Sequence, residues 1–328
     1  MTALVTGGAG FIGSHLVDRL LADGEEVRVL DNFSTGRREN LSSAVDLYEG
    51  DILDEELVRK AVKGADVVFH QAALTSVARS VEQPLATGLT NTHGTLNLLV
   101  AARDAGARRV VYASSSSVYG GVGPLPSTET GPTCPRSPYS ASKLAAEQYC
   151  RVFSELYGLG TVALRYFNVY GPRQAVGSAY AAAVPLFIQA LCRGEAPVVH
   201  GDGRQSRDFT FVEDVVEANL AAANAPPEAV GHVFNVARGS SQSLLELLEI
   251  LSQLLGARVD PVHREPRPGD VRQSMADVRA ARELLGFQAR VAFHEGLRRT
   301  VEWFRPGLGV GILTGGKVPE QHRAHGRE

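Results

Sequence analysis

The glycine-rich segment near the start of the chain constrains the fold more than any other feature. It reads Gly7-Gly8-Ala9-Gly10-Phe11-Ile12-Gly13 and stands between a short apolar segment, residues 3–6, and an amphipathic helical pattern. Glycines in this context let the backbone turn tightly and approach a pyrophosphate, whose charge the helix N-terminus stabilises. Strand, glycine turn and helix together predict a dinucleotide-binding βαβ unit.

Asp31 follows the next strand-like segment, residues 26–30, roughly twenty residues beyond the glycines. A carboxylate in this position can accept hydrogen bonds from both hydroxyls of a ribose, and it would repel a 2′-phosphate. We therefore expect NAD rather than NADP, although Arg37 and Arg38 are close enough in sequence to leave NADP open.

Strand-like and helix-like segments alternate through the first half of the chain. Residues 66–70 and 109–113 are typical of buried strands, and Thr92 to Arg103 predicts a helix. Such alternation indicates right-handed crossovers and an α/β protein with a doubly wound parallel sheet, the Rossmann fold. Ligands of such sheets bind at the carboxyl ends of the strands.

The pattern becomes less regular in the second half, where residues 244–255 predict a strongly apolar helix. We expect an NAD-binding Rossmann domain over 1–167, to which segments near 208–237 return. A smaller C-terminal α/β substrate domain is expected over 168–305. Residues 306–328 lack periodicity and predict a flexible tail.

Composition excludes several classes of function. The 328 residues are 44% hydrophobic and 21% charged, with a net charge of −3, which favours neither nucleic acid nor an anionic membrane as a partner. No apolar run approaches a membrane span, and the start lacks the pattern of a signal peptide. Cys134, Cys150 and Cys192 are scattered, so we expect reduced thiols, no metal site and a cytoplasmic location.

Tyr139 and Lys143 are the candidate catalytic pair. Residues four apart share one face of a helix, and Ser137-Pro138 predicts where that helix begins. A free phenol has a pKa near 10, and we expect a nearby ammonium and an oxidised nicotinamide ring to lower it. The four serines, Ser114 to Ser117, directly follow the strand-like segment 109–113 and offer hydroxyls to the same site.

These residues resemble the extended short-chain dehydrogenase/reductase family, and within it the NAD-dependent UDP-hexose 4-epimerases. The resemblance covers residues 2–304. It is carried by the glycine loop, by the Tyr–Lys pair and by the segments His70 to Ala73, Ser114 to Gly120, Arg165 to Arg173, Gly201 to Gly203, Arg207 to Phe209 and Arg267 to Asp270.

The resemblance implies inversion at C4 of a UDP-sugar. Tyr139 would take the proton of the 4-hydroxyl while hydride passes to a NAD that stays bound, and the 4-keto sugar would then turn over. Ser115 matches the family's catalytic Ser/Thr and would bond the same oxygen. The implied cofactor contacts are Gly7, Gly10, Phe11, Ile12, Gly13, Asp31, Asn32, Ser34, Thr35, Gly36, Asp51, Ile52, Gln71, Ala72, Ala73, Lys143 and Tyr166. The implied substrate contacts are Ser76, Ser115, Ser116, Ser117, Tyr139, Asn168, Ala182, Val184, Arg207, Arg267, Asp270 and Ser274.

Other activities of the same family are alternatives. Dehydratases usually carry Asp-Glu where Ser116 and Ser117 stand, and UDP-glucuronate decarboxylases usually carry Glu in place of Ser117. A dehydratase needs an acid and a base to remove the proton at C5 of the sugar and to protonate the leaving hydroxyl. Serine side chains cannot do this at neutral pH. A non-catalytic NAD-sensing regulator is a further alternative, but such proteins usually lose the tyrosine or the lysine.

The sugar is the least determined feature. Ser274 is small where glucose-restricted epimerases carry bulkier residues, which leaves room for an N-acetyl group; Thr75, where such enzymes often have Gly, argues against it. The four serines also resemble UDP-glucuronate 4-epimerases, but Ala175 stands where those have an arginine. We expect UDP-GlcNAc/UDP-GalNAc, together with UDP-Glc/UDP-Gal, ahead of the uronate. The helices near Thr92 and Tyr139 resemble those that pair in family homodimers.

Overall fold

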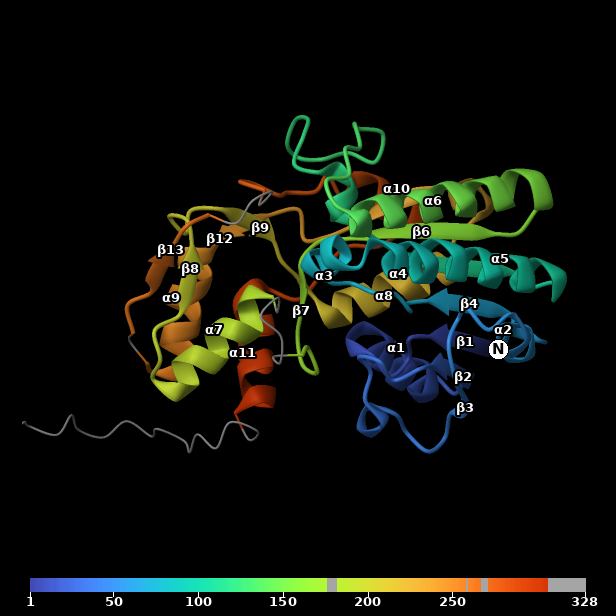
Figure 1. The fold of residues 1–328 in the computed structure, drawn as a ribbon, viewed down its shortest axis with the longest axis horizontal. Helices are drawn as coiled ribbons and strands as arrows, with labels where there is room; N and C mark the ends of the chain where they lie inside the picture. The colour runs from blue at the N-terminus through green and yellow to red at the C-terminus, as the bar shows by residue number, and fades with distance from the viewer. Residues whose placement is uncertain (176–181, 258, 267–270, 306–328) are drawn as a thin grey trace, which may run out of the picture.

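The computed structural model describes residues 1–175, 182–257, 259–266 and 271–305. Figure 1 shows a larger lobe built around a sheet and a smaller, mainly helical lobe beside it. The sheet has seven strands in the order β11-β6-β5-β4-β1-β2-β3, and all its pairs are parallel. The strands are β1 (Thr2–Thr6), β2 (Glu26–Asp31), β3 (Asp46–Glu49), β4 (Val67–His70), β5 (Arg109–Ser115), β6 (Thr161–Tyr166) and β11 (Val233–Val236).

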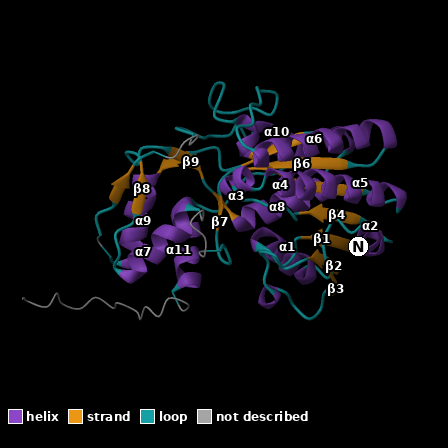
Figure 2. Cartoon of the chain, viewed as in Figure 1, coloured by secondary structure: helices purple, strands orange, loops and turns teal. Residues whose placement is uncertain are grey.

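Helices cover both faces of this sheet, as Figure 2 makes visible. One face packs against α1 (Phe11–Ala22), α8 (Val212–Ala223) and α10 (Arg279–Leu285). The other face packs against α2 (Glu55–Val62), α5 (Gly94–Asp104) and α6 (Pro138–Tyr157). Successive side chains of a strand point to opposite faces, so Ala3 and Val5 join the first layer and Leu4 the second. The predicted doubly wound sheet is confirmed.

The strand order reverses direction at β1. The chain adds β2 and β3 on one side of β1 and then returns to add β4, β5 and β6 on the other. The segments that leave β1 and β4 therefore diverge and open a crevice at the carboxyl edge of the sheet, where such folds bind their ligands. Gly7 and Gln71 are the first residues beyond these two strands.

The smaller lobe packs three helices around an aromatic core. These are α7 (Ala183–Arg193), α9 (Leu244–Leu255) and α11 (Phe293–Phe304). The rings of Tyr170, Phe209 and Phe293 meet in this core. The helix predicted over 244–255 is confirmed; Ser243 and Glu246 form a capping box, and Gly256 ends it at φ +66°.

Short strand pairs complete the smaller lobe and connect it to the sheet. They are β7 (Val169–Tyr170) with β10 (Thr210–Phe211), β9 (Ser206–Asp208) with β12 (Ser241–Ser243), and β8 (Val198–His200) with β13 (Val262–Arg264). Beside α5 and α6 lie α3 (Val77–Glu82), α4 (Pro84–Gly88) and the π-helical segment Leu89–His93. Within the described ranges, none of the helices combines the length and apolar character needed to span a bilayer.

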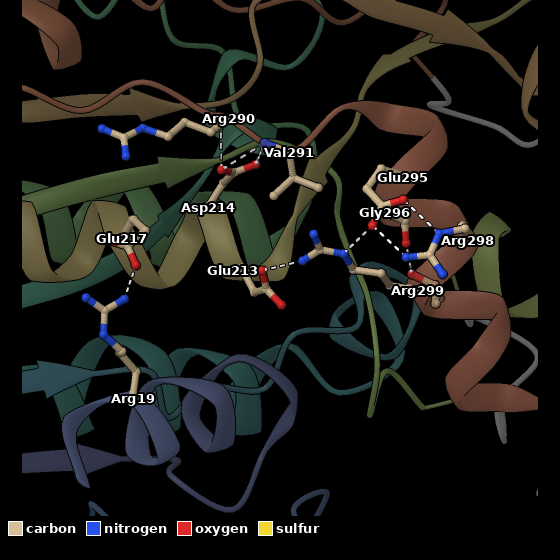
Figure 3. A network of polar contacts seen from close by, with 11 residues as sticks. Arg19, Glu213, Asp214, Glu217, Arg290, Val291, Glu295, Gly296, Arg298 and Arg299 are labelled. Carbon is tan, nitrogen blue, oxygen red and sulfur yellow. Dashed lines mark hydrogen bonds and ion pairs between the residues drawn. The ribbon is translucent and has the colours of Figure 1, made fainter. Parts of the chain in front are cut away.

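Polar contacts along α8 join the two lobes (Figure 3). The Asp214 carboxylate accepts the backbone N–H groups of Arg290 and Val291, at 2.8 and 3.2 Å. Glu213 forms an ion pair with Arg299 of α11 at 2.8 Å. Because α8 also packs on the sheet, these contacts fix the smaller lobe above the carboxyl edge of the strands.

Candidate active site

A cavity of about 2300 Å³ lies at the carboxyl edge of the sheet, between the two lobes. The glycine loop, the serines at the end of β5 and just beyond it, and the start of α6 line it on the sheet side. Asn168, Arg207 and Ser274 line it on the side of the smaller lobe. The fold therefore brings together segments from both halves of the chain, which lie far apart in the sequence.

The glycine loop is packed too closely for side chains. Gly7 has φ +68°, and a Cβ there would lie 2.7 Å from the backbone nitrogen of Ala72. A Cβ on Gly13 would overlap the carbonyl oxygen of Gly7. The N-cap of α1, Gly10, makes no side-chain cap, and the first turn carries no acidic residue. The amides of that turn are thus available to an anion, so the loop fits the diphosphate of a dinucleotide.

Asp31 ends β2 beside this loop and is nearly fully buried. Its carboxylate accepts the N–H of Ala9 at 2.9 Å and the N–H of Phe33 at 2.8 Å, which orient it toward the cavity wall. The Asn32 amide donates to the Asp51 carboxylate at 2.7 Å, bringing together two predicted cofactor contacts that are distant in sequence. Oxygen acceptors thus gather beyond β2 and β3, as ribose hydroxyls require.

Helix α6 positions Tyr139 and Lys143 at the floor of the cavity. Ser137 caps the helix in a reciprocal arrangement with Ser140, and Pro138 occupies the first turn, so the predicted start is confirmed. Both side chains of the pair are at least nine-tenths buried. The Lys143 ammonium donates to the carbonyl of Ala113 at 2.9 Å and lies 6.0 Å from the centre of the Tyr139 ring.

Burial controls the protonation of this pair. It lowers the pKa of Lys143 to about 8, against the opposing effects of Cys150 and Glu147. It raises the pKa of Tyr139 above its ordinary value, while a hydrogen bond with Ser115 lowers it. The pKa of the phenol was expected to be lowered, but in the protein without its cofactor it is raised. The desolvation of the phenolate outweighs the hydrogen bond with Ser115.

The serine segment begins on β5 and continues as the 3₁₀ helix Ser116–Tyr119. The Ser115 hydroxyl accepts the N–H of Ser117 at 3.2 Å and contacts the Tyr139 phenol. The hydroxyl of Ser117 is buried without a partner among the described residues. Ser115, Ser116 and Ser117 all line the cavity.

The predicted site residues are distributed unevenly. All the described cofactor candidates except Gly36 line the cavity, and so do all the described substrate candidates except Val184. Gly36 packs against Ala9, and Val184 is buried in the core of the smaller lobe. Arg267 and Asp270 lie outside the described residues.

A buried polar chain beneath the site was not predicted from the sequence. His70 contacts Thr6 through Nδ1 at 2.7 Å and Thr95 through Nε2 at 2.9 Å, and burial lowers its pKa to about 3. Asn91, in the π-helical segment, bonds both backbone groups of Leu74 and the hydroxyl of Ser142. Local spacing carries no signal for these contacts, since each joins a different pair of elements.

Glu147 was also missed, although a sequence signal existed. It stands four residues after Lys143 on the face that bears Tyr139, and its carboxylate forms an ion pair with Arg165 of β6 at 2.8 Å. Among the described residues, no cluster of three or more His, Cys, Asp or Glu could hold a metal. The three cysteines are unpaired.

A Rossmann sheet whose carboxyl edge carries a serine, a tyrosine and a lysine defines a short-chain dehydrogenase/reductase of the extended type. Residues 3–237 match the NAD dependent epimerase/dehydratase family. The chain is 44% identical over 312 residues to the UDP-glucose 4-epimerase of Mycolicibacterium smegmatis, which covers 93% of this chain and 99% of that protein.

Two solved structures are similar over nearly the whole chain. The UDP-glucose 4-epimerase of Thermotoga maritima with UDP-glucose has a TM-score of 0.90 and 41% identity, covering 94% of this chain and 100% of that one. The UDP-N-acetylglucosamine 4-epimerase of Methanobrevibacter ruminantium, in complex with UDP-N-acetylmuramic acid, has a TM-score of 0.89 and 41% identity, covering 93% and 98%. The chain belongs to the NAD-dependent epimerase/dehydratase family, and NAD is its cofactor.

Proposed function

We propose that this protein is an NAD-dependent UDP-sugar 4-epimerase, which inverts C4 through a transient 4-keto sugar. The observation that carries the proposal is the placement of Ser115, Tyr139 and Lys143 in the same cavity as the glycine loop. Ser116 and Ser117 also line that cavity, and neither can serve as the additional acid or base that a dehydratase requires.

Tyr139 moves the proton of the sugar 4-hydroxyl, and Ser115 holds the oxygen by a hydrogen bond. NAD, when bound, supplies the acceptor and later the donor of the hydride at C4. Once the 4-keto sugar has turned over, the opposite face of C4 would be presented to the cofactor, and Tyr139 returns the proton to the 4-oxygen. The phenol must lose its proton more easily than burial alone allows. The hydrogen bond with Ser115 lowers its pKa, and we propose that a charged Lys143 on the same helix face acts in the same direction.

The cofactor contacts follow the walls of the cavity. We assign the diphosphate to the first turn of α1, over Gly10, Phe11 and Ile12, and a ribose to Asp31. Lys143, which lines the cavity, would bind the second ribose. The close approach of Gly7 to Ala72 supports this assignment, because the backbone there leaves no room for any side chain.

The substrate contacts lie on the side of the smaller lobe. We propose that Asn168 and Arg207 bind the diphosphate of the nucleotide sugar, since a guanidinium suits phosphate geometry. Arg267, with the same proposed role, and Asp270, a proposed ribose contact, lie outside the described residues. Ser274 lines the cavity with a small side chain, which supports UDP-GlcNAc/UDP-GalNAc beside UDP-Glc/UDP-Gal as substrates.

We also propose a cytoplasmic homodimer. Leu85 of α4 is 82% exposed and Leu156 of α6 is 72% exposed. Leu89 of the π-helical segment that follows α4 and Tyr157 of α6 are exposed as well. Pairing of two copies through these helices would cover that surface, and light scattering at native concentration tests it. Three unpaired thiols are typical of a reducing compartment, which cell fractionation tests.

The test is incubation with UDP-GlcNAc, UDP-Glc and UDP-GlcA in separate reactions, followed by proton NMR. An epimerase produces a second diastereomer, whereas a protein that only binds NAD leaves each sugar unchanged. Tyr139→Phe should abolish turnover and leave NAD bound, because it removes only the phenolic oxygen. Undiminished turnover in this variant would overturn the role given to Tyr139.

A further inference from the structure

Glu147 lies on the helix that carries Tyr139 and Lys143 and contacts the strand that carries Ser115. It lies on α6 one turn beyond Lys143 and two turns beyond Tyr139, and it is nearly fully buried. Both of its carboxylate oxygens are used. Oε1 accepts the Ser114 hydroxyl and the Nε of Arg165 at 2.9 Å, and Oε2 accepts the Nη2 of Arg165 at 2.8 Å.

These contacts bind the helix to the ends of two strands. Ser114 precedes Ser115 on β5, and the residue before it, Ala113, supplies the carbonyl that holds the Lys143 ammonium. Arg165 precedes Tyr166 on β6, which lines the cofactor cavity. A single carboxylate therefore fixes the catalytic helix relative to the strand that carries the hydroxyl partner.

The same carboxylate supplies the negative charge that faces Lys143. The titratable groups around the ammonium are Tyr139, Glu147 and Cys150 on α6, Tyr112 on β5 and His70 on β4. His70 stays neutral in the working range, and burial raises the pKa of Cys150 far above it. Burial lowers the pKa of Lys143, whereas Cys150 and Glu147 raise it. Glu147, itself paired with Arg165, is the one carboxylate among these groups.

We propose that Glu147 is a positioning residue of the reaction, which places a negative charge one helical turn from Lys143 and aligns α6 with Ser115 through Ser114 and Arg165. The proposal rests on the proposed function for the meaning of that alignment. Its electrostatic half concerns Lys143 in the resting protein and can be measured without turnover.

The first experiment compares Glu147→Gln with the native protein. Lysine side chains carrying a ¹³C label at Cε are titrated by NMR in the cofactor-free protein, and kcat with UDP-glucose is measured from pH 6 to 10. We expect the Lys143 midpoint to fall by about one pH unit and the alkaline limit of kcat to fall with it. Glu155→Gln, an exposed carboxylate on the same helix paired with Arg151, should change neither.

An unchanged Lys143 midpoint in folded Glu147→Gln would overturn the proposal, and this result does not depend on which sugar is turned over. Removing one partner of a buried pair can prevent folding, so Ser114→Ala provides a second measurement without any change of charge. It should lower kcat severalfold, with the Lys143 midpoint and NAD affinity unchanged. Native kcat in Ser114→Ala would contradict the alignment half of the proposal.

Discussion

The burial of Lys143 should cost the folded protein stability, and Lys143→Met exposes that cost. Its pKa is about 8, whereas that of an ordinary lysine is 10.5. Because a difference of one in pKa corresponds to about 1.4 kcal/mol, the folded protein disfavours the charged lysine by about 3 kcal/mol. The variant leaves the Ala113 carbonyl without its donor, which costs about 1 kcal/mol. We therefore expect cofactor-free Lys143→Met to be about 2 kcal/mol more stable at pH 7.

The pH dependence of this difference is the sharper result. Below about pH 8 the lysine is protonated in both the folded and the unfolded chain. The difference in the free energy of unfolding between Lys143→Met and the native protein is therefore constant there. Between pH 8 and 10.5 the unfolded chain binds more protons, so the free energy of unfolding of the native protein rises relative to the variant. The advantage of Lys143→Met should therefore shrink as the pH rises toward 10.

Urea unfolding followed by circular dichroism at pH 7, 8, 9 and 10 measures the free energy of unfolding of the native protein and of each variant. Lys60→Met is the matched control, because Lys60 is exposed on α2 and its ion pair with Glu56 raises its pKa. Its gap to the native protein should stay constant to pH 10. A gap for Lys143→Met that is likewise independent of pH would refute the argument that burial disfavours the ammonium.

Two further substitutions test the walls of the cavity. Gly13→Ala forces a Cβ into the Gly7 carbonyl and displaces α1 from the loop, so NAD affinity measured by calorimetry should fall at least tenfold, whereas Gly88→Ala, with open space around it, should bind normally. Native affinity in Gly13→Ala would contradict the cofactor placement. Ser274→Tyr should reduce kcat/KM for UDP-GlcNAc more than for UDP-Glc, because the larger side chain would fill the space proposed for the N-acetyl group. Equal losses for the two sugars would contradict that placement of the N-acetyl group.

The features that local spacing encodes were predictable from the sequence. The glycine turn, the helix over 244–255 and the start of α6 each depend on neighbouring residues, and each is confirmed. The pairs β7 with β10 and β9 with β12 were not foreseen, because two or three residues are too few to show a period. Their pairing is set by tertiary contacts instead.

The candidate site was predictable as a set of residues but not as an electrostatic environment. Its tyrosine and lysine are recognisable from their spacing. Neighbouring charges alone do not determine the pKa of Tyr139, because desolvation has the largest effect on it. Burial depends on how completely α6 is covered by β5, β6 and the helices beside it. That burial arises from tertiary packing and could not be predicted from the sequence.

The Glu147–Arg165 pair illustrates what such an environment adds. A buried ion pair gains little net stability over apolar residues of the same volume, because desolvation offsets the attraction between the charges. Stability is thus a weak reason for a buried carboxylate on the catalytic helix. Geometry is a stronger one, since apolar side chains could not hold Ser114 and Arg165 in fixed register or place a negative charge one turn from Lys143.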